Sequence, residues 1–479
     1  MKEIEQFSIP MSSEELHTPS SVGNDSPEHT DPGIGSHHVS TELQQLQLDV
    51  PDVTEDGSVT EDVSVTDTER DKVIIIDGQA VVQSITKLHC MNTISDLGDT
   101  FIKRIDGITK SYTEVRVIFD RYITGSFKDQ TRAKRAGKTH PVKFLIKGQM
   151  NIGNISMKML LSHAETKSQL TEYLGGRLLE HFAGSDKGMV VVYGTSTLSN
   201  REGVFDPDLS THDHEEADTQ IPMHVLDATA MSTSVRDIYV WSPDTDVFLL
   251  LLDLVATYPV RGNLVLLTGT GKLYRTIDIK ERCDVIGPEK SKALIGVHNF
   301  TGADWDGKFF NISKRTWITK FLALTPGDEI VGTLQKFGSI DEPGESDIKQ
   351  MEKFVCNVYS SKSACVTVCD LRWELFKTKN CEGEKLPPTQ NTLKPHIQRV
   401  NFICRRDKSY KDPRPILPHP KDNGWEQKSD GKLAPVRCLN KPAPLAVMEL
   451  VKCGCKGSCQ GKTNCSCHKN FLALHYANV

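Results

Sequence analysis

The sequence predicts an α/β protein with a central, mainly parallel sheet that is flanked by helices. Short β-branched and apolar runs, typical of strands that are buried on both faces, recur along the chain. Helical patterns separate these runs, and such alternation is typical of a parallel sheet. Both ends depart from the pattern: the N-terminal end is acidic and polar, and the C-terminal end is rich in proline and cysteine.

The regular elements are predicted within a domain that spans residues 71–340. Strands are expected over 73–76, 114–120, 189–195, 237–242 and 263–269. Helices are expected over 155–184, 215–231, 246–258 and 288–325.

Residues 1–70 are predicted to be a disordered acidic tail. They contain sixteen acidic and two basic residues, a net charge of −14, and almost no aromatic residues. Such a segment cannot bury enough apolar surface to offset its ordering entropy. Because the whole chain carries −6, the remainder carries +8. A mildly basic body is weakly consistent with contact with a polyanion.

The C-terminal part is predicted to hold three segments. A helical extension is expected over 341–384, and an irregular segment with dense prolines over 385–446. A cysteine-rich tail follows over 447–479.

The composition also indicates a cellular compartment. The opening MKEIEQFSIP is acidic and lacks an apolar core, so no secretory signal is expected. The longest apolar run, Val247 to Leu252, is far too short to cross a bilayer, and we expect no membrane partner. Thirteen cysteines in such a chain indicate thiols or metal ligands rather than disulfides. We therefore predict a nuclear location, with a cytoplasmic one as the alternative.

Seven carboxylates fall at predicted strand ends or beside predicted helices. They are Asp77, Asp120, Glu216, Asp218, Asp244, Asp246 and Asp304. In open α/β sheets, functional groups gather at the carboxyl ends of the strands. Side chains two residues apart in extended chain point the same way, so Asp244 and Asp246 are expected to converge. The sequence therefore predicts one acidic pocket.

Such a pocket favours divalent metal ions. Two carboxylates about 4 Å apart repel by roughly 4 kcal/mol at an effective dielectric constant of 20. Hard oxygen ligands select Mg²⁺, Mn²⁺ or Ca²⁺. A cluster of this size suits two ions roughly 3.5–4 Å apart, as in phosphodiester cleavage. A single D-x-D string is usually a turn or a helix cap, so the prediction depends on the ordered series of acids.

The ordered strings IIIDG, VIFDRY, EEADTQ, SPDTDVF and TGAD resemble the flap endonuclease (XPG-type) branch of the PIN-like nucleases. They are more similar still to a largely uncharacterised metazoan group that is associated with mobile elements. The resemblance implies a PIN-like nuclease fold in which all seven acids serve two Mg²⁺ or Mn²⁺ ions, directly or through water. The chain departs from that group at Ala303 and at Trp305-Asp306, which replace a cysteine and two threonines.

Basic residues after Asp120 are candidates for nucleic-acid binding, because cations at close spacing neutralise phosphates. They are Arg121, Lys128, Arg132, Lys134, Arg135 and Lys138, and the resemblance adds Lys314 and Arg315 as a contact to duplex backbone. A solvated basic helix is the alternative for the first group. DNA is the expected partner, with RNA as the alternative.

Five cysteines near the C-terminal end are candidate zinc ligands, because dense thiolates favour zinc. They are Cys453, Cys455, Cys459, Cys465 and Cys467. The string resembles the first half of a tesmin-type CXC module. A zinc site, a truncated module and a disordered thiol cluster remain the alternatives.

Three functions follow from these patterns. The first is a two-metal, structure-specific nuclease that hydrolyses DNA or RNA and is related to mobile elements. The second is an inactive, nuclease-derived protein that binds nucleic acid or acts as an adaptor. The third is a zinc-linked interaction scaffold whose acidic tail is the contact surface. His212 and His214 are interpreted as loop residues beside a helix start rather than as ligands.

Overall fold

The structure, a computed structural model, describes residues 71–440 except 124, 127, 130–140, 270–272, 304–306, 380–384 and 430. Several predictions therefore lie outside the described residues. They concern segment 1–70, the tail 447–479 with its five cysteines, Asp304, and the cations Arg132, Lys134, Arg135 and Lys138.

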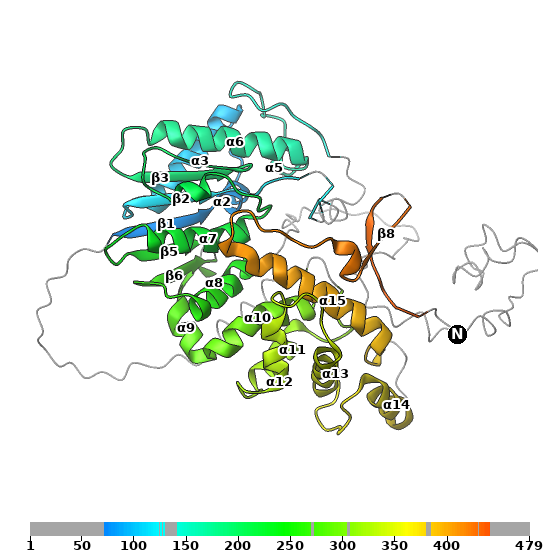
Figure 1. Ribbon diagram of the computed structural model, residues 1–479. Coiled ribbons are helices and arrows are strands. Elements are labelled where there is room, and N and C mark those ends of the chain that lie inside the picture. The colour runs from blue at the N-terminus through cyan, green and yellow to red at the C-terminus, as the bar shows by residue number, and fades with distance from the viewer. Residues whose placement is uncertain are drawn as a thin grey trace, which may run out of the picture.

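A seven-stranded sheet forms the centre of the molecule (Figure 1). Its order is β4-β3-β2-β1-β5-β6-β7. The strands are β1 (Lys72–Asp77), β2 (Glu114–Ile118), β3 (Gly188–Tyr193), β4 (Ser196–Ser199), β5 (Asp237–Trp241), β6 (Leu264–Thr268) and β7 (Arg275–Asp278). All pairs are parallel except those of the two edge strands, β4 and β7. The predicted fold class is confirmed.

Strand β1 lies at the middle of this sheet. It pairs with β2 on one side and with β5 on the other, so the strand order reverses there. Its apolar residues are fully buried, and successive side chains enter opposite cores: Val73 and Ile75 one, Ile74 and Ile76 the other. This explains the continuous apolar run, because a strand covered on both faces does not alternate with polar residues.

Helices cover both faces of the sheet. One core is closed by α2 (Gly78–Ser84), α3 (Ile94–Thr109), α5 (Met157–Leu160) and α6 (Ala164–His181). The other is closed by α7 (Ala217–Ala230), α8 (Thr245–Thr257), α9 (Ile279–Ile286) and α10 (Pro288–Phe300). In the part of the chain that is described, no helix is long and apolar enough to cross a membrane.

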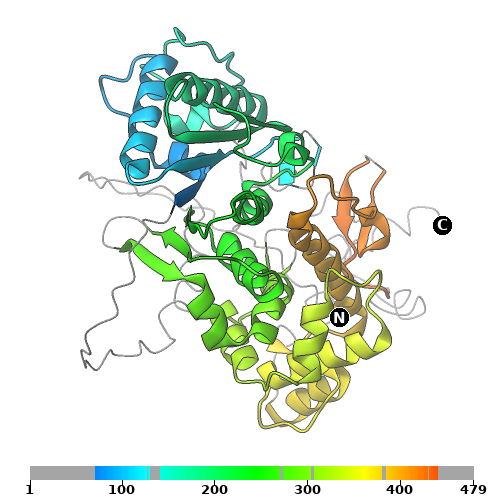
Figure 2. The ribbon, with the colours of Figure 1, turned by 60° about the vertical axis from the view of Figure 1, so that its left-hand side comes forward.

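The second core continues into the C-terminal part of the chain, which lies at the opposite end of the molecule from α3 and α6 (Figure 2). Its elements are α11 (Lys314–Leu322), α12 (Glu329–Lys336), α13 (Glu345–Tyr359), α14 (Val368–Lys379), α15 (Gln390–Asp407), the 3₁₀ turns η5 (Lys408–Lys411) and η6 (Pro420–Asp422), and a hairpin of β8 (Trp425–Gln427) and β9 (Leu433–Pro435). Aromatic rings of Phe300, Trp317 and Phe354 pack together and join α10, α11 and α13.

The prediction of irregular chain over 385–446 is wrong for residues 390–407, which form α15. Leu393, Ile397 and Val400 are fully buried at helical spacing, so one face of α15 packs into the core. Pro395 lies inside the helix and has no N–H to donate to the Asn391 carbonyl. The N–H of Leu439 donates to that carbonyl instead, at 3.0 Å. A contact distant in sequence thus satisfies the group that proline leaves unpaired.

A buried arginine ties helix α7 to the sheet. Arg116 of β2 is fully buried, and its Nε donates to Glu114 Oε1 at 2.7 Å. Its Nη1 pairs with Asp227 of α7 and lies 3.3 Å from the His224 carbonyl oxygen. Its Nη2 donates to the Val204 carbonyl at 3.0 Å. Because α7 begins beside the acidic residues Glu216 and Asp218, this network also helps to place them.

We predict that Arg116→Met destabilises the protein by about 3–5 kcal/mol, because the buried carboxylate of Asp227 then loses its counter-charge, whereas Glu114 keeps its pair with Arg236 at 2.9 Å. Arg177→Met is the matched control, since Arg177 pairs with the half-exposed Asp99 at the surface. It should cost less than about 1 kcal/mol. Urea unfolding of both variants measures the difference, and equal small losses would contradict a structural role for Arg116.

Candidate active site

Three aspartates stand at the carboxyl ends of the three central strands. Asp77 ends β1, Asp120 follows β2 by two residues, and Asp244 follows β5 by three. Each carboxylate accepts a hydrogen bond of 2.9 Å from a backbone N–H. The N–H of Ala80 donates to Asp77, the N–H of Ala217 donates to Asp120, and the N–H of Asp246 donates to Asp244. They meet where the strand order reverses, which is the position at which open α/β sheets bind ligands.

Three more acids lie at the starts of α7 and α8. Glu216 precedes α7, and its side chain does not cap that helix. Its Oε1 instead lies 3.0 Å from Lys128 Nζ and 3.7 Å from Arg406 Nη1. Asp218 lies in the first turn of α7, and Asp246 lies in the first turn of α8. The bond from Ala217 N–H to Asp120 brings the start of α7 to the end of β2.

The acids form one electrostatic cluster. Burial, followed by the Asp120 and Asp244 carboxylates, raises the pKa of Asp77 to about 7, against the opposing hydrogen bond from the Ala80 N–H. Burial raises the pKa of Asp218 well above its ordinary value, and Asp244, Glu216 and Asp246 add to that rise. Asp244 belongs to both groups, so all six described acids are linked.

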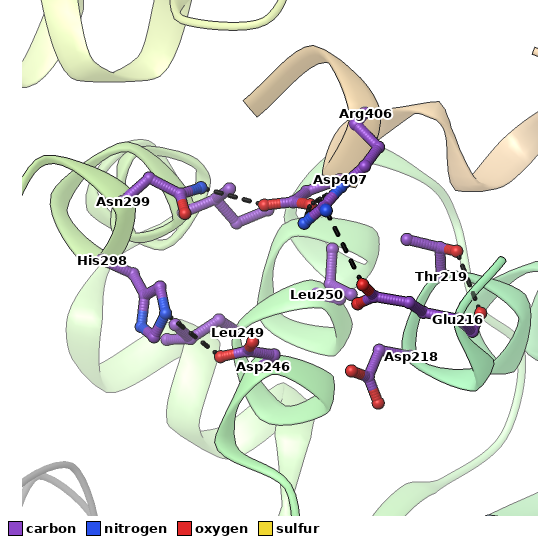
Figure 3. A pocket seen from close by; sticks show the side chains of 11 residues that line it. Glu216, Asp218, Thr219, Asp246, Leu249, Leu250, His298, Asn299, Arg406 and Asp407 are labelled. Atoms are coloured by element: carbon purple, nitrogen blue, oxygen red, sulfur yellow. Dashed lines mark hydrogen bonds and ion pairs between the residues drawn. The ribbon is translucent and has the colours of Figure 1, made fainter. Parts of the chain in front are cut away.

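A pocket opens beside these acids (Figure 3). The residues that line it are Glu216, Asp218, Thr219, Asp246, Leu249, Leu250, Ile295, His298, Asn299, Arg406 and Asp407. They lie at the start of α7, in α8, in α10 and at the end of α15. The pocket thus combines the sheet domain with the C-terminal helices.

His298 connects the pocket to a buried lysine. Its Nε2 lies 3.1 Å from Asp246 Oδ1, and its Nδ1 lies 3.0 Å from Lys314 Nζ. Because an ammonium group only donates, Nδ1 accepts and Nε2 carries the proton toward Asp246. Lys314 also donates to the Gly302 carbonyl at 2.8 Å.

This geometry corrects the prediction for Lys314. The side chain is 7% exposed and turned toward His298, so it does not reach a duplex backbone. The neighbouring Arg315 is exposed, and its contact with nucleic acid stays a prediction. Of the cations after Asp120, Arg121 lies 3.7 Å from Asp213, and Lys128 pairs with Glu216 at the pocket.

His212 and His214 are buried in the loop before α7 and lie beside the site. His214 Nε2 lies 2.7 Å from the Asp412 carbonyl oxygen, and its Nδ1 lies 2.9 Å from the Thr219 hydroxyl. Burial lowers the pKa of His212 to about 4, with His214 adding to the effect. Both residues lie in the loop before α7, as the sequence predicts.

The donor chemistry of the cluster fits Mg²⁺ or Mn²⁺, because buried carboxylates with raised pKa values gain from a hard divalent cation. Among the residues that the structure describes, no group of three or more His, Cys, Asp or Glu side chains is arranged to hold a metal ion. Glu216 faces Lys128 and Arg406, and Asp246 faces His298. Metal binding by the seven acids stays a prediction.

Comparison with known proteins gives structural likenesses. No family model matches the chain, and no curated protein matches it. Among solved structures, it is similar to the bacteriophage T5 D15 flap endonuclease in a pseudo-enzyme–product complex with DNA and metal ions. The identity is 11%, the TM-score is 0.31, and the match covers 71% of this chain and 97% of that chain.

We predict that Asp77→Asn stabilises the metal-free protein by about 2–4 kcal/mol at pH 8. The unfolded carboxyl ionises around 3.8 and the folded one around 7, so its contribution to stability is full below pH 4 and is lost as the pH rises to about 7. The side-chain oxygen of asparagine still accepts the hydrogen bond from the Ala80 N–H, but it carries no charge. Urea unfolding in EDTA at pH 4 and pH 8 measures the gain, which should vanish at the lower pH.

Asp278→Asn is the matched control, because Asp278 caps α9 through the same kind of bond, to Lys280 N–H at 2.9 Å. It should bring no gain at pH 8. An Asp77→Asn protein that is no more stable than wild type at pH 8 would contradict the burial and charge repulsion inferred for Asp77.

Proposed function

We propose that the protein is a metal-dependent nuclease that hydrolyses phosphodiester bonds of DNA, with RNA as the alternative substrate. The observation that carries the proposal is the convergence of six acids from the ends of three parallel strands and the starts of two helices. A purely structural role does not explain why these carboxylates are placed where they raise one another's pKa values.

The side chains that would hold divalent ions are those whose charges raise one another's pKa values. Asp77, Asp120 and Asp244 form one such group, and Asp218 joins it through Asp244. When bound, two Mg²⁺ or Mn²⁺ ions supply an activated water and stabilise the leaving oxygen. Asp304 is the seventh acid of the ordered series in the sequence.

Other residues of the chain orient groups around these acids. His298 donates its Nε2–H to Asp246 and fixes that carboxylate, while Lys314 holds the histidine in this tautomer. Lys128 and Arg121 lie beside the acids at the end of β2, where their charges suit the phosphates of a substrate strand.

A catalytically inactive binding or adaptor protein is the second candidate. The observation that favours it is the pairing of Glu216 with Lys128 and Arg406, since these cations supply positive charge that a metal ion supplies in a nuclease. Such a protein binds nucleic acid without cleaving it.

Three further proposals rest on the sequence resemblance. We propose that the protein is related to mobile elements, that it works in the nucleus, and that the tail cysteines bind zinc.

We predict that the purified full chain cleaves labelled flap, hairpin or single-stranded DNA or RNA when Mn²⁺ is added. Asp218→Asn and Asp244→Ala should each lower the cleavage rate at least about a hundredfold, because each removes an oxygen ligand of the ions. Asp341→Asn is the control, since Asp341 is fully exposed and pairs only with Arg405 among the ion pairs described.

Metal-dependent cleavage that persists unchanged in both acid variants would contradict the proposed site. Binding of these substrates by wild-type protein without any cleavage would instead support the adaptor.

A further inference from the structure

Helix α15 ends at the acidic pocket and brings an arginine to it. We propose that Arg406 is a phosphate-binding residue for a nucleic-acid strand, positioned by hydrogen bonds to Asp407 and through it by Asn299. The inference rests on the proposed nuclease function, because it places a substrate phosphate at the same site. Arg406 belongs to the segment in which the sequence predicted no regular element.

A chain of two hydrogen-bonded residues holds the guanidinium. Its Nε and Nη2 donate to Asp407 Oδ1 at 3.0 and 2.7 Å. The other oxygen of that carboxylate, Oδ2, accepts from Asn299 Nδ2 of α10 at 2.9 Å. Asn299 is 2% exposed, so this series of hydrogen bonds is anchored in the core. Figure 3 shows Arg406 and Asp407 projecting from α15 above Glu216.

The ion pair of Arg406 with Glu216 is longer than its hydrogen bonds to Asp407. Nη1 lies 3.7 Å from Glu216 Oε1, which is beyond ordinary hydrogen-bond distance. Hydrogen bonds to Asp407 therefore position the guanidinium, and its Nη1 faces Glu216 at the pocket. The side chain is 27% exposed, so a ligand can reach it.

A phosphate is the ligand that this arrangement fits. Arginine presents N–H donors in a fixed fork that matches two oxygens of a phosphate, and such charge-assisted bonds are strong. Glu216, Asp218 and Asp246 line the same pocket and would repel a phosphate that came alone. When a phosphate enters together with divalent cations, the cations neutralise the charge of these carboxylates, and the phosphate can contact the guanidinium. Arg406 thus selects an anionic strand rather than a neutral ligand.

The test measures binding of short fluorescein-labelled single-stranded DNA, and of RNA of the same sequence, by fluorescence anisotropy. The full chain is titrated once in Ca²⁺, which supports binding without rapid cleavage, and once in EDTA. Arg406→Gln should raise the Kd in Ca²⁺ about tenfold, the loss expected for a charge-assisted bond. Arg406→Lys should lie between that variant and wild type, because it keeps the charge and loses the fork.

Arg405→Gln is the matched control. Arg405 is the adjacent residue of α15, but its Nη2 donates to the Ile340 carbonyl at 2.8 Å and to Asp341 at 2.9 Å, away from the pocket. It removes the same charge and should change the Kd by less than about twofold. Thermal unfolding of all variants identifies any that fail to fold. If Arg406→Gln fails to fold, the Kd of Arg406→Lys still tests the inference.

Equal Kd values for Arg406→Gln and Arg405→Gln would overturn the inference, and so would a wild-type protein that binds neither DNA nor RNA. The two proposals fail separately. Arg406-dependent binding by a wild-type protein that never cleaves would remove the nuclease function and leave the phosphate contact. Cleavage and binding that are the same in both arginine variants would remove only the phosphate contact.

Discussion

The repulsion among carboxylates at the carboxyl edge of the sheet is the constraint on which the rest of the structure depends. Asp77, Asp120 and Asp244 are held beside one another because three parallel strands end there and a backbone N–H fixes each side chain. Burial and mutual repulsion raise the pKa of Asp77 to about 7. A cluster of this kind needs positive charge, which Lys128 and Arg406 supply from the protein and which divalent ions supply more fully.

The C-terminal part of the chain completes this site rather than standing apart from it. Helix α15 carries Arg406 and Asp407 to the pocket, and the segment after it docks on the loop before α7. There the Asp213 N–H donates to the Pro413 carbonyl at 2.8 Å, and Arg414 donates to the Thr211 carbonyl at 3.0 Å. The loop that leads to Glu216 is therefore held between the sheet and the C-terminal segment, which keeps the acids and the arginine in one arrangement.

The sequence predicts those features that leave a local signal. The five parallel strands are apolar runs, and the acids at their ends occupy fixed places relative to them. The edge strands β4 and β7 leave no such signal because they are short and largely polar. Helix α3 is not among the predicted helices, although Thr93 and Asp96 form a capping box at its start. Arg406 could not be predicted, because only tertiary packing brings α15 to α7. The burial of Lys314 against His298 has the same cause.

The central claim is that the acids at the carboxyl edge bind divalent metal ions, and crystals soaked in MnCl₂ test it most directly. An anomalous difference map collected at the manganese absorption edge locates bound ions without reference to activity. We predict two peaks roughly 3.5–4 Å apart among Asp77, Asp120, Asp218 and Asp244. A well-ordered map without a peak at these residues, with Lys128 and Arg406 still paired to Glu216, would contradict the claim.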